Sequence, residues 1–140
     1  MSGTGTRTCD IDPDVVKNLE KFRFDKSKET RAMILKIDMQ KLCIVEDKHL
    51  EGTTLEDLAD ELPENSPRYI ILSYKRVLSD RVTYPLVFIY YNPDTAKTDL
   101  KMMYSSAKMV LSAASSIAGK VVDLTTLDDL TEAHLNSKLL

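Results

Sequence analysis

Two segments in the middle of the chain place the strongest constraint on its fold. Residues 68–75 and 82–91 are dense in Ile, Leu, Val, Phe and Tyr and are bounded by turn residues, which predicts two β-strands. Alternate residues of a strand point to opposite faces of a sheet, and here apolar residues occupy both sets of positions. We therefore expect a sheet that is covered on both faces.

The first third of the chain supplies a helix and two more strands. Asp12 followed by Pro13 is typical of a helix start, and apolar residues then recur at helical spacing up to about Phe24. Residues 31–38 and 41–47 are rich in Ile, Leu, Met and Val and predict a β-hairpin.

The remaining segments predict three helices and one strand. Residues 54–62 predict a short acidic helix, expected to be a surface connection. The longest helix begins at the Asn92-Pro93 pair and ends near Gly119. Residues 120–124 predict a short strand, and Thr126 opens a final helix that runs to the C-terminus.

This order of elements predicts an α/β (α+β) fold, with a central mixed β-sheet sandwiched between helices. The length of 140 residues and the apolar content of 43% suit one domain with a substantial core. We assign residues 10–140 to that domain. Residues 1–9 lack apolar periodicity and are expected to form a flexible N-terminal tail.

Charge and composition argue against several classes of function. A formal net charge of −3 gives no global attraction to nucleic acid or to an anionic membrane, so neither partner is expected. We find neither the apolar region of a secretion signal nor a stretch long enough for a membrane span. Two cysteines are too few for a disulfide framework and fit a reducing compartment. A cytoplasmic protein is expected, with entry to the nucleus by size alone.

No residue pattern points to catalysis. His49 and His134 lie in separate polar contexts without metal-ligand spacing, so we expect surface histidines. The four glycines cannot form a phosphate-binding loop. Cys43 lies in a predicted strand, where a buried and unreactive thiol is expected. We predict no catalytic residue, no metal site and no cofactor.

The predicted long helix has two unlike faces. One is an apolar stripe that should pack on the sheet, made of Ala96, Leu100, Met103, Ala107, Val110, Ala114 and Ile117. The opposite face has small hydroxyls and two methionines in place of the usual mixed charges, in Thr98, Lys101, Met102, Ser105, Met109, Ser112 and Ser116. Methionine is flexible and polarizable, so this face favours docking into another protein's cleft, with Lys101 and Lys108 at its margins. Burial of the helix on both sides, or serine enrichment without functional cause, are the alternatives on the residues alone.

Several strings of residues match one known family. Residues 101–108, Lys-Met-Met-Tyr-Ser-Ser-Ala-Lys, follow a pattern of lysine, two large apolar residues, tyrosine, small residues and lysine. Further matching strings are Lys21-Phe22-Arg23-Phe24, Asp60-Glu61-Leu62-Pro63-Glu64, Pro67-Arg68-Tyr69-Ile70, Ser73-Tyr74-Lys75 and Arg81-Val82-Thr83-Tyr84-Pro85-Leu86. Over about residues 8–139 the chain resembles glia maturation factor, within the actin-depolymerising factor/cofilin homology family.

The resemblance implies a fold, a function and partners. The fold is a single actin-depolymerising-factor homology domain. Glia maturation factors bind the branch-nucleating actin-related protein complex, suppress its nucleation of actin and promote debranching of actin filaments. The implied partners are that complex and the first actin subunit of the daughter filament. The implied protein is a non-enzymatic monomer of the actin cytoskeleton.

The resemblance also implies two partner-binding surfaces. The first, here called surface 1, comprises Arg23, Lys101, Met102, Ser105, Lys108 and Met109. The second, surface 2, comprises Arg76, Asp80, Arg81, Glu132 and Lys138. Ser2 is a candidate phosphorylation site, because related proteins are switched off by phosphorylation in their N-termini, although an unmodified tail serine is the alternative.

Asp99 separates this chain from members of the family that bind and sever actin, which carry a lysine at that position. An anion there should weaken attraction to an acidic partner surface, which favours the actin-related complex over actin as the partner. A conventional cofilin-like severing protein and a small inhibitor of a signalling kinase are the alternative functions.

Overall fold

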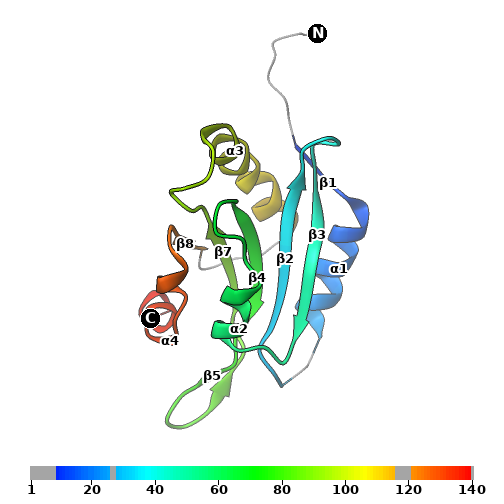
Figure 1. The fold of residues 1–140 in the computed structure, drawn as a ribbon. Helices are drawn as coiled ribbons and strands as arrows, with labels where there is room; N and C mark the ends of the chain where they lie inside the picture. Colours follow the sequence, from blue (N-terminus) through cyan, green and yellow to red (C-terminus); the bar gives the residue numbers. More distant parts are fainter. Residues whose placement is uncertain (1–8, 26–27, 116–120, 140) are drawn as a thin grey trace.

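The computed structural model describes residues 9–25, 28–115 and 121–139. Its main sheet has six strands in the order β1-β3-β2-β4-β7-β8, and a separate two-stranded hairpin projects from one end (Figure 1). The six strands are β1 (Asp10–Ile11), β2 (Arg31–Asp38), β3 (Cys43–Glu51), β4 (Arg68–Ser73), β7 (Leu86–Tyr91) and β8 (Val121–Leu124). Neighbours pair antiparallel in the centre, while β1 with β3 and β7 with β8 pair parallel at the edges. The sheet is mixed, as predicted.

Two pairs of helices cover the two faces of the sheet. The helices are α1 (Pro13–Phe24), α2 (Leu55–Asp60), α3 (Thr98–Ser115) and α4 (Glu132–Lys138). One core joins α1 and α3 to the sheet through residues such as Leu19, Ala107 and Leu111. The second core, on the opposite face, buries leucines of α2 and α4, including Leu58 and Leu135. The predicted sandwich of a sheet between helices is confirmed.

The short acidic helix is more than the surface connection that we expected. Leu55 and Leu58 of α2 and the following Leu62 are buried in the second core. Thr54 caps the helix by accepting a hydrogen bond from the backbone N–H of Asp57 at 3.0 Å. The acidic residues face solvent while three leucines cover the sheet, so α2 is an amphipathic covering helix.

The single strand predicted over residues 82–91 is two strands. Residues Val82–Thr83 form β6, which pairs with β5 (Arg76–Val77), whereas β7 begins only at Leu86 and pairs with β4. Pro85 lies between them and has no N–H for a ladder, which separates the hairpin from the main sheet.

Both C-terminal helices begin later than predicted. Residues 93–96 form a turn and α3 starts at Thr98, and the predicted end near Gly119 lies outside the described residues. Thr126 caps only a 3-10 turn, Leu127–Asp129. Thr131 is the N-cap of α4, because its side chain accepts from the N–H of His134 at 3.2 Å.

The packed domain begins one residue before the predicted boundary at residue 10. Cys9, assigned to the tail from its sequence context, is only 4% exposed and packs in the first core. It precedes β1, which the sequence did not predict and which pairs with only Cys43 and Ile44 of β3. Two residues are too few for a strand pattern, so the pairing depends on the neighbouring strand.

Candidate functional site: the outer face of α3 and the β5–β6 hairpin

The inner face of α3 is fixed to the sheet by a buried tyrosine. Tyr104 is 3% exposed, and its hydroxyl accepts a hydrogen bond from the N–H of Ile37 at 3.0 Å. The hydroxyl of Tyr69 donates to the carbonyl of Tyr104, whose ring centroid lies 5.3 Å from that of Tyr69. Burial raises the pKa of both tyrosines, so both hydroxyls stay protonated near neutral pH. These contacts limit rotation of the helix about its axis.

The buried stripe is turned slightly from the one predicted. Tyr104, Ala107 and Leu111 are buried, whereas Leu100 and Met103 of the predicted stripe are only partly buried. Tyr104 and Leu111 are seven residues apart, about two helical turns, so they lie one above the other toward the sheet. Tyr104 and Leu111 occupy the central positions because their large side chains fill the space between α3 and the sheet.

The outer face of α3 exposes both methionines, as predicted. Met102 is 67% and Met109 79% exposed, and Ser105 is exposed between them. This arrangement argues against burial of the helix on both sides within the domain. A pair of large apolar side chains presented on an anchored helix is a surface suited to partner contact.

The two lysines of surface 1 differ in their surroundings. Lys108 pairs with Asp123 of β8 and lies above the Tyr90 ring, with distances of 3.1 Å to the carboxylate and 5.1 Å to the ring centroid. Lys101 is half-buried and has no ion-pair partner among the residues that the structure describes. Asp99 lies in the first turn, where a carboxylate is favourable, and its Oδ1 accepts from the N–H of Leu100 at 2.9 Å.

Arg23 lies at the end of α1, beside an exposed aromatic residue. Its guanidinium carbon is 4.9 Å from the ring centroid of Phe24, which is 66% exposed. Within the described segments, no hydrogen bond or ion pair joins Arg23 to α3, although α1 and α3 share one core. Phe24 was not predicted to be a surface residue. Its position two residues after the buried Phe22, on another side of the helix, was the only sign of exposure in the sequence.

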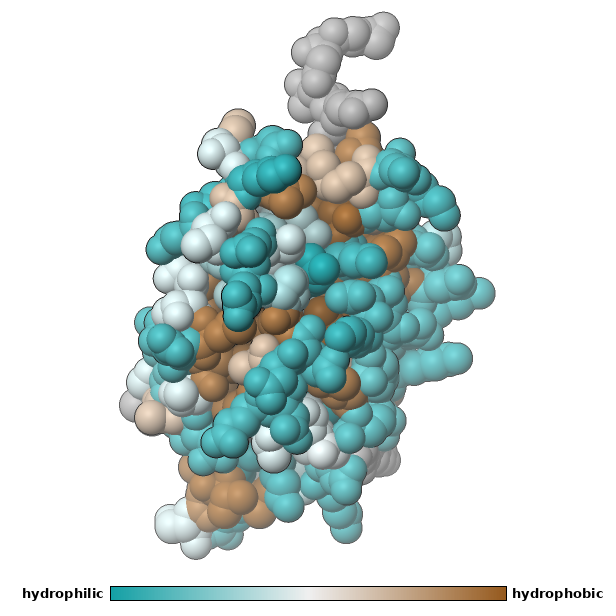
Figure 2. All heavy atoms as spheres, viewed as in Figure 1, coloured by the Kyte–Doolittle hydropathy of each residue, from teal (hydrophilic) through white to brown (hydrophobic). Residues whose placement is uncertain are grey.

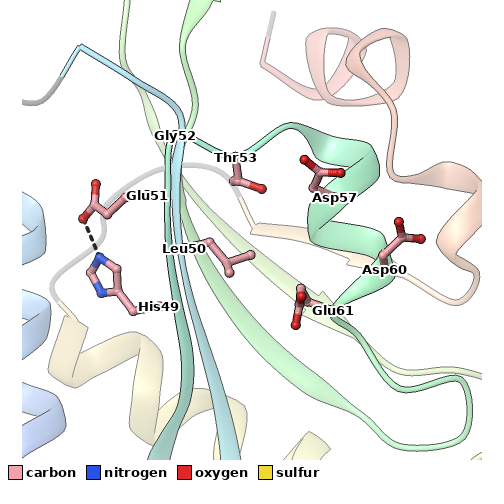
Figure 3. Close-up of a pocket in the computed structure, with 8 residues that line it drawn as sticks. All are labelled: His49, Leu50, Glu51, Gly52, Thr53, Asp57, Asp60 and Glu61. Carbon is pink, nitrogen blue, oxygen red and sulfur yellow. Dashed lines mark hydrogen bonds and ion pairs between the residues drawn. The ribbon is translucent and has the colours of Figure 1, made fainter.

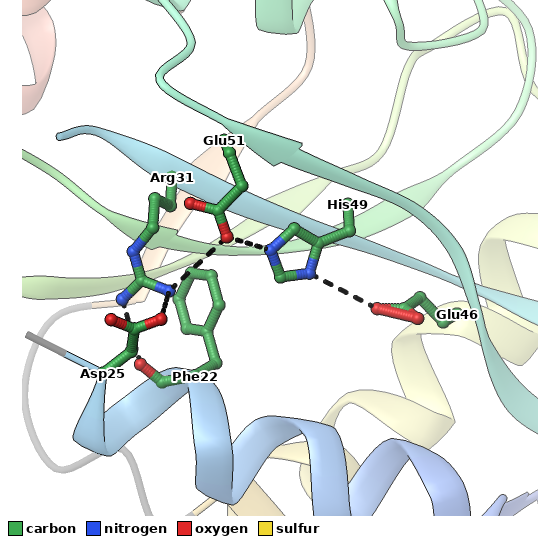
Figure 4. A network of polar contacts seen from close by, with 6 residues as sticks. All are labelled: Phe22, Asp25, Arg31, Glu46, His49 and Glu51. Carbon is green, nitrogen blue, oxygen red and sulfur yellow. Dashed lines mark hydrogen bonds and ion pairs between the residues drawn. The ribbon is translucent and has the colours of Figure 1, made fainter. Parts of the chain in front are cut away.

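A buried arginine fixes the end of α1 that presents Arg23 (Figure 4). Arg31 is 1% exposed, and its Nη2 donates to the carbonyl of Phe22 at 3.1 Å. Its Nη1 lies 3.3 Å from a carboxylate oxygen of Asp25 and 4.0 Å from Glu51, and its guanidinium stacks 4.3 Å from the Phe22 ring centroid. The guanidinium therefore gives a carbonyl at the C-terminal end of α1 a hydrogen-bond partner. It also links this end of the helix to β2, which contains Arg31, and to β3, which contains Glu51.

Surface 2 is assembled from two segments far apart in the sequence. Arg76 of β5 donates from Nε to the Oδ1 of Asn136 on α4 at 3.3 Å. Asp80 and Arg81 are exposed at the tip of the hairpin, where the N–H of Leu78 bonds to the carbonyl of Arg81 at 2.8 Å. The other two predicted residues, Glu132 and Lys138, are exposed on α4.

Exposed valines are the part of surface 2 that sequence reasoning missed. Val77 is 71% and Val82 44% exposed, and these two are cross-strand partners. Figure 2 shows an apolar patch at this end of the molecule. Both valines are visible in the sequence as apolar residues beside the predicted turn. The prediction of one continuous strand over residues 82–91, however, placed Val82 in the main sheet.

An open acidic depression lies elsewhere, between the end of β3 and α2 (Figure 3). It has a volume of about 400 Å³, and its lining includes Glu51, Asp57, Asp60 and Glu61. Two of these are already paired, Glu51 with His49 at 2.6 Å and Glu61 with Lys48. In the described parts of the chain, no three His, Cys, Asp or Glu residues form a group that could hold a metal ion.

The two cysteines have the unreactive character expected of Cys43. Burial is the main cause that raises the pKa of Cys9 to about 11, with smaller contributions from Cys43 and Asp10. The same cause raises the pKa of Cys43, which is half-buried rather than buried as predicted. Ser2, the candidate phosphorylation site, lies outside the described residues. Among the residues that are described, every helix is too short or too polar to cross a membrane.

Comparisons with known proteins assign this fold to a class. The family model described as cofilin/tropomyosin-type actin-binding protein matches residues 8–140, so the chain belongs to that family. The family consists of actin-binding regulators and is not a known enzyme family, which gives the chain an actin-related partner in general terms.

Within that class, the chain belongs with the glia maturation factors. It is 41% identical to glia maturation factor of Drosophila melanogaster, over 94% of this chain and 95% of the relative. It is 43% identical to human glia maturation factor beta, over 94% and 92% of the two chains. The solution structure of glia maturation factor from Caenorhabditis elegans matches with a TM-score of 0.81 and 32% identity, over 99% of both chains. The predicted family and fold are confirmed.

Proposed function

We propose that this protein binds the branch-nucleating actin-related protein complex, inhibits its nucleation of actin and promotes debranching of filaments. The observation that supports the proposal most is the outer face of α3, where Met102 and Met109 project from a helix anchored by Tyr104. Membership among the glia maturation factors supports the identity of the partner.

Two surfaces at different places on the domain suit a wedging mechanism. Surface 1 lies mainly on α3, which packs on the first core, whereas surface 2 joins the hairpin to α4, which packs on the second. Surface 1 would hold the complex while surface 2 meets the first actin subunit of the daughter filament. Debranching then requires better contacts to the debranched than to the branched state, and no bond is broken.

The direct test is to watch filaments branched by the purified complex, with and without this protein. Branch loss and filament severing are scored separately, and bare filaments provide a parallel sample. We expect faster branch loss without severing. Severing of bare filaments would instead favour a cofilin-like function, and no effect on either would overturn the proposal.

A charge reversal tests surface 1 within the same proposal. We expect Lys101→Glu, alone or together with Lys108→Glu, to lower affinity for the complex in a pull-down, since the proposed partner surface is acidic. Lys17→Glu is the matched control, because Lys17 is exposed on α1 and the change in net charge equals that of Lys101→Glu. Unchanged affinity of the double variant would count against surface 1.

A further inference from the structure

The positive charge of Lys108 is already compensated within the domain. Its Nζ donates to Oδ1 of Asp123 at 3.1 Å, and the lysine side chain is 29% exposed against 65% for the aspartate. Asp123 comes from β8, 15 residues further along the sequence. The carboxylate is therefore an exposed anion at the margin of surface 1.

Sheet register explains why the aspartate lies there. Asp123 and Tyr90 are paired neighbours on the parallel strands β8 and β7. Lys108 reaches from α3 over the Tyr90 ring, 5.1 Å from its centroid, to the carboxylate beside that ring. One lysine thus has two partners, an aromatic ring below it and an anion beside it.

These pairings leave little net charge on the outer face of α3. Lys101 and Lys108 are balanced in number by Asp99 and Asp123, so the face is close to neutral as a whole. A partner carboxylate that approaches Lys108 meets Asp123 at nearly the same distance. Repulsion between the two anions offsets part of the attraction to the lysine.

Tyr90 gives Lys108 a second contact that does not depend on the aspartate. The Lys108 cation lies over the face of a ring that is 6% exposed and belongs to the first core. Removal of the Asp123 charge would leave an ordered lysine with an uncompensated positive charge, rather than a freely moving side chain.

We propose that Asp123 is a specificity-determining residue that restrains the affinity of surface 1 for acidic partners by neutralising Lys108, an inference that rests on the proposed function. The partner group that competes with Asp123 is a carboxylate on the surface of an actin-related subunit.

The test is a double-mutant cycle with Asp123→Asn, Lys108→Met and the combined variant. Dissociation constants are measured for the purified actin-related complex and for monomeric actin, at several salt concentrations. Asp57→Asn is the matched control, since Asp57 is exposed on α2 and the loss of charge is the same. Thermal unfolding of each variant verifies that it is folded.

We expect Asp123→Asn to tighten binding about twofold to fivefold at low salt, the range that exposed charge pairs contribute. The gain should shrink as salt rises and should vanish in the Lys108→Met background. Asp57→Asn should have no such effect.

The outcomes separate this inference from the proposed function. Binding of the parent protein with unchanged or weaker binding of Asp123→Asn would overturn the inference alone. A gain that persists without Lys108 would also overturn it, because the aspartate would then act on the partner directly. Failure of the parent and of every variant to bind either partner would overturn both.

Discussion

The outer face of α3 and the β5–β6 hairpin both expose apolar residues, but they are held to the domain in opposite ways. The helix has 18 residues, and its inner side is locked by Tyr104, Ala107 and Leu111 in the first core. Each strand of the hairpin has two residues, and a hydrogen bond from Arg76 to Asn136 ties it to α4. Local stability follows the number of buried contacts, so the helix is suited to firm docking and the hairpin to adjustable contact.

The largest difference expected between the helix and the hairpin is in folding stability. Leu111→Ala removes a fully buried side chain beneath α3 and should lower the free energy of unfolding by about 2–5 kcal/mol. Val77→Ala, at an exposed hairpin position, should change it by less than about 0.5 kcal/mol. Denaturant unfolding of both variants measures the difference. Equal losses would show that the hairpin is as firmly integrated as the helix.

Alkaline pH should lower the stability of the domain through Cys9, which is buried in the first core with α3. Burial in the first core raises the pKa of Cys9 from 9.0 to about 11, so between these values the folded state retains a proton that the unfolded state has lost. The contribution of the Cys9 thiol to the free energy of unfolding is fully present below pH about 9. It should fall by on the order of 2 kcal/mol as pH rises through about 11.

The readout for this prediction is the slope of unfolding free energy against pH, compared between the parent and Cys9→Ala. The variant should lose stability less steeply over this interval. Its overall stability is not the criterion, because removal of the buried thiol has its own cost. Parallel slopes would contradict the assignment to Cys9.

Partner binding should depend on the methionines of α3. Replacing Met102 and Met109 together by alanine should weaken binding to the actin-related complex by about tenfold, because both large side chains would lose the apolar contact that they make when the complex covers them. Met39→Ala is the matched control, since Met39 is also exposed but lies in the β2–β3 turn. A similar loss of affinity in the double variant and in Met39→Ala would show that the contact with the complex lies elsewhere.

The smallest effect on binding is expected at the hairpin. Arg76→Ala with Arg81→Ala should change affinity for the complex by less than about twofold, since rim charges contribute little, while slowing branch loss more strongly. Lys75→Ala tests whether loss of a nearby exposed cation has the same consequence. If binding to the complex falls in proportion to branch loss, the hairpin contributes to affinity as the helix does, and the distinction between the two regions is wrong.

Most of the fold was predictable because its strongest signals are local. The Asp12-Pro13 helix start, the both-sided apolar strands and the outward methionines of α3 each follow from spacing within one segment. Pro85 also carried local information, but a dense apolar run on either side of it led to one predicted strand where there are two. Short elements such as β1 lack enough residues for any periodic pattern.

The sequence by itself determined the family, the layered architecture and the face of α3 that meets solvent, since helix and strand periodicity fix which residues share a side. Only the tertiary structure placed Asp123 beside Lys108, joined Arg76 to α4 and buried Arg31 against the end of α1. The first two contacts join segments 15 and 60 residues apart, and the third joins α1 to the strand that follows it. Their partners are chosen by strand register and packing, which no local pattern specifies.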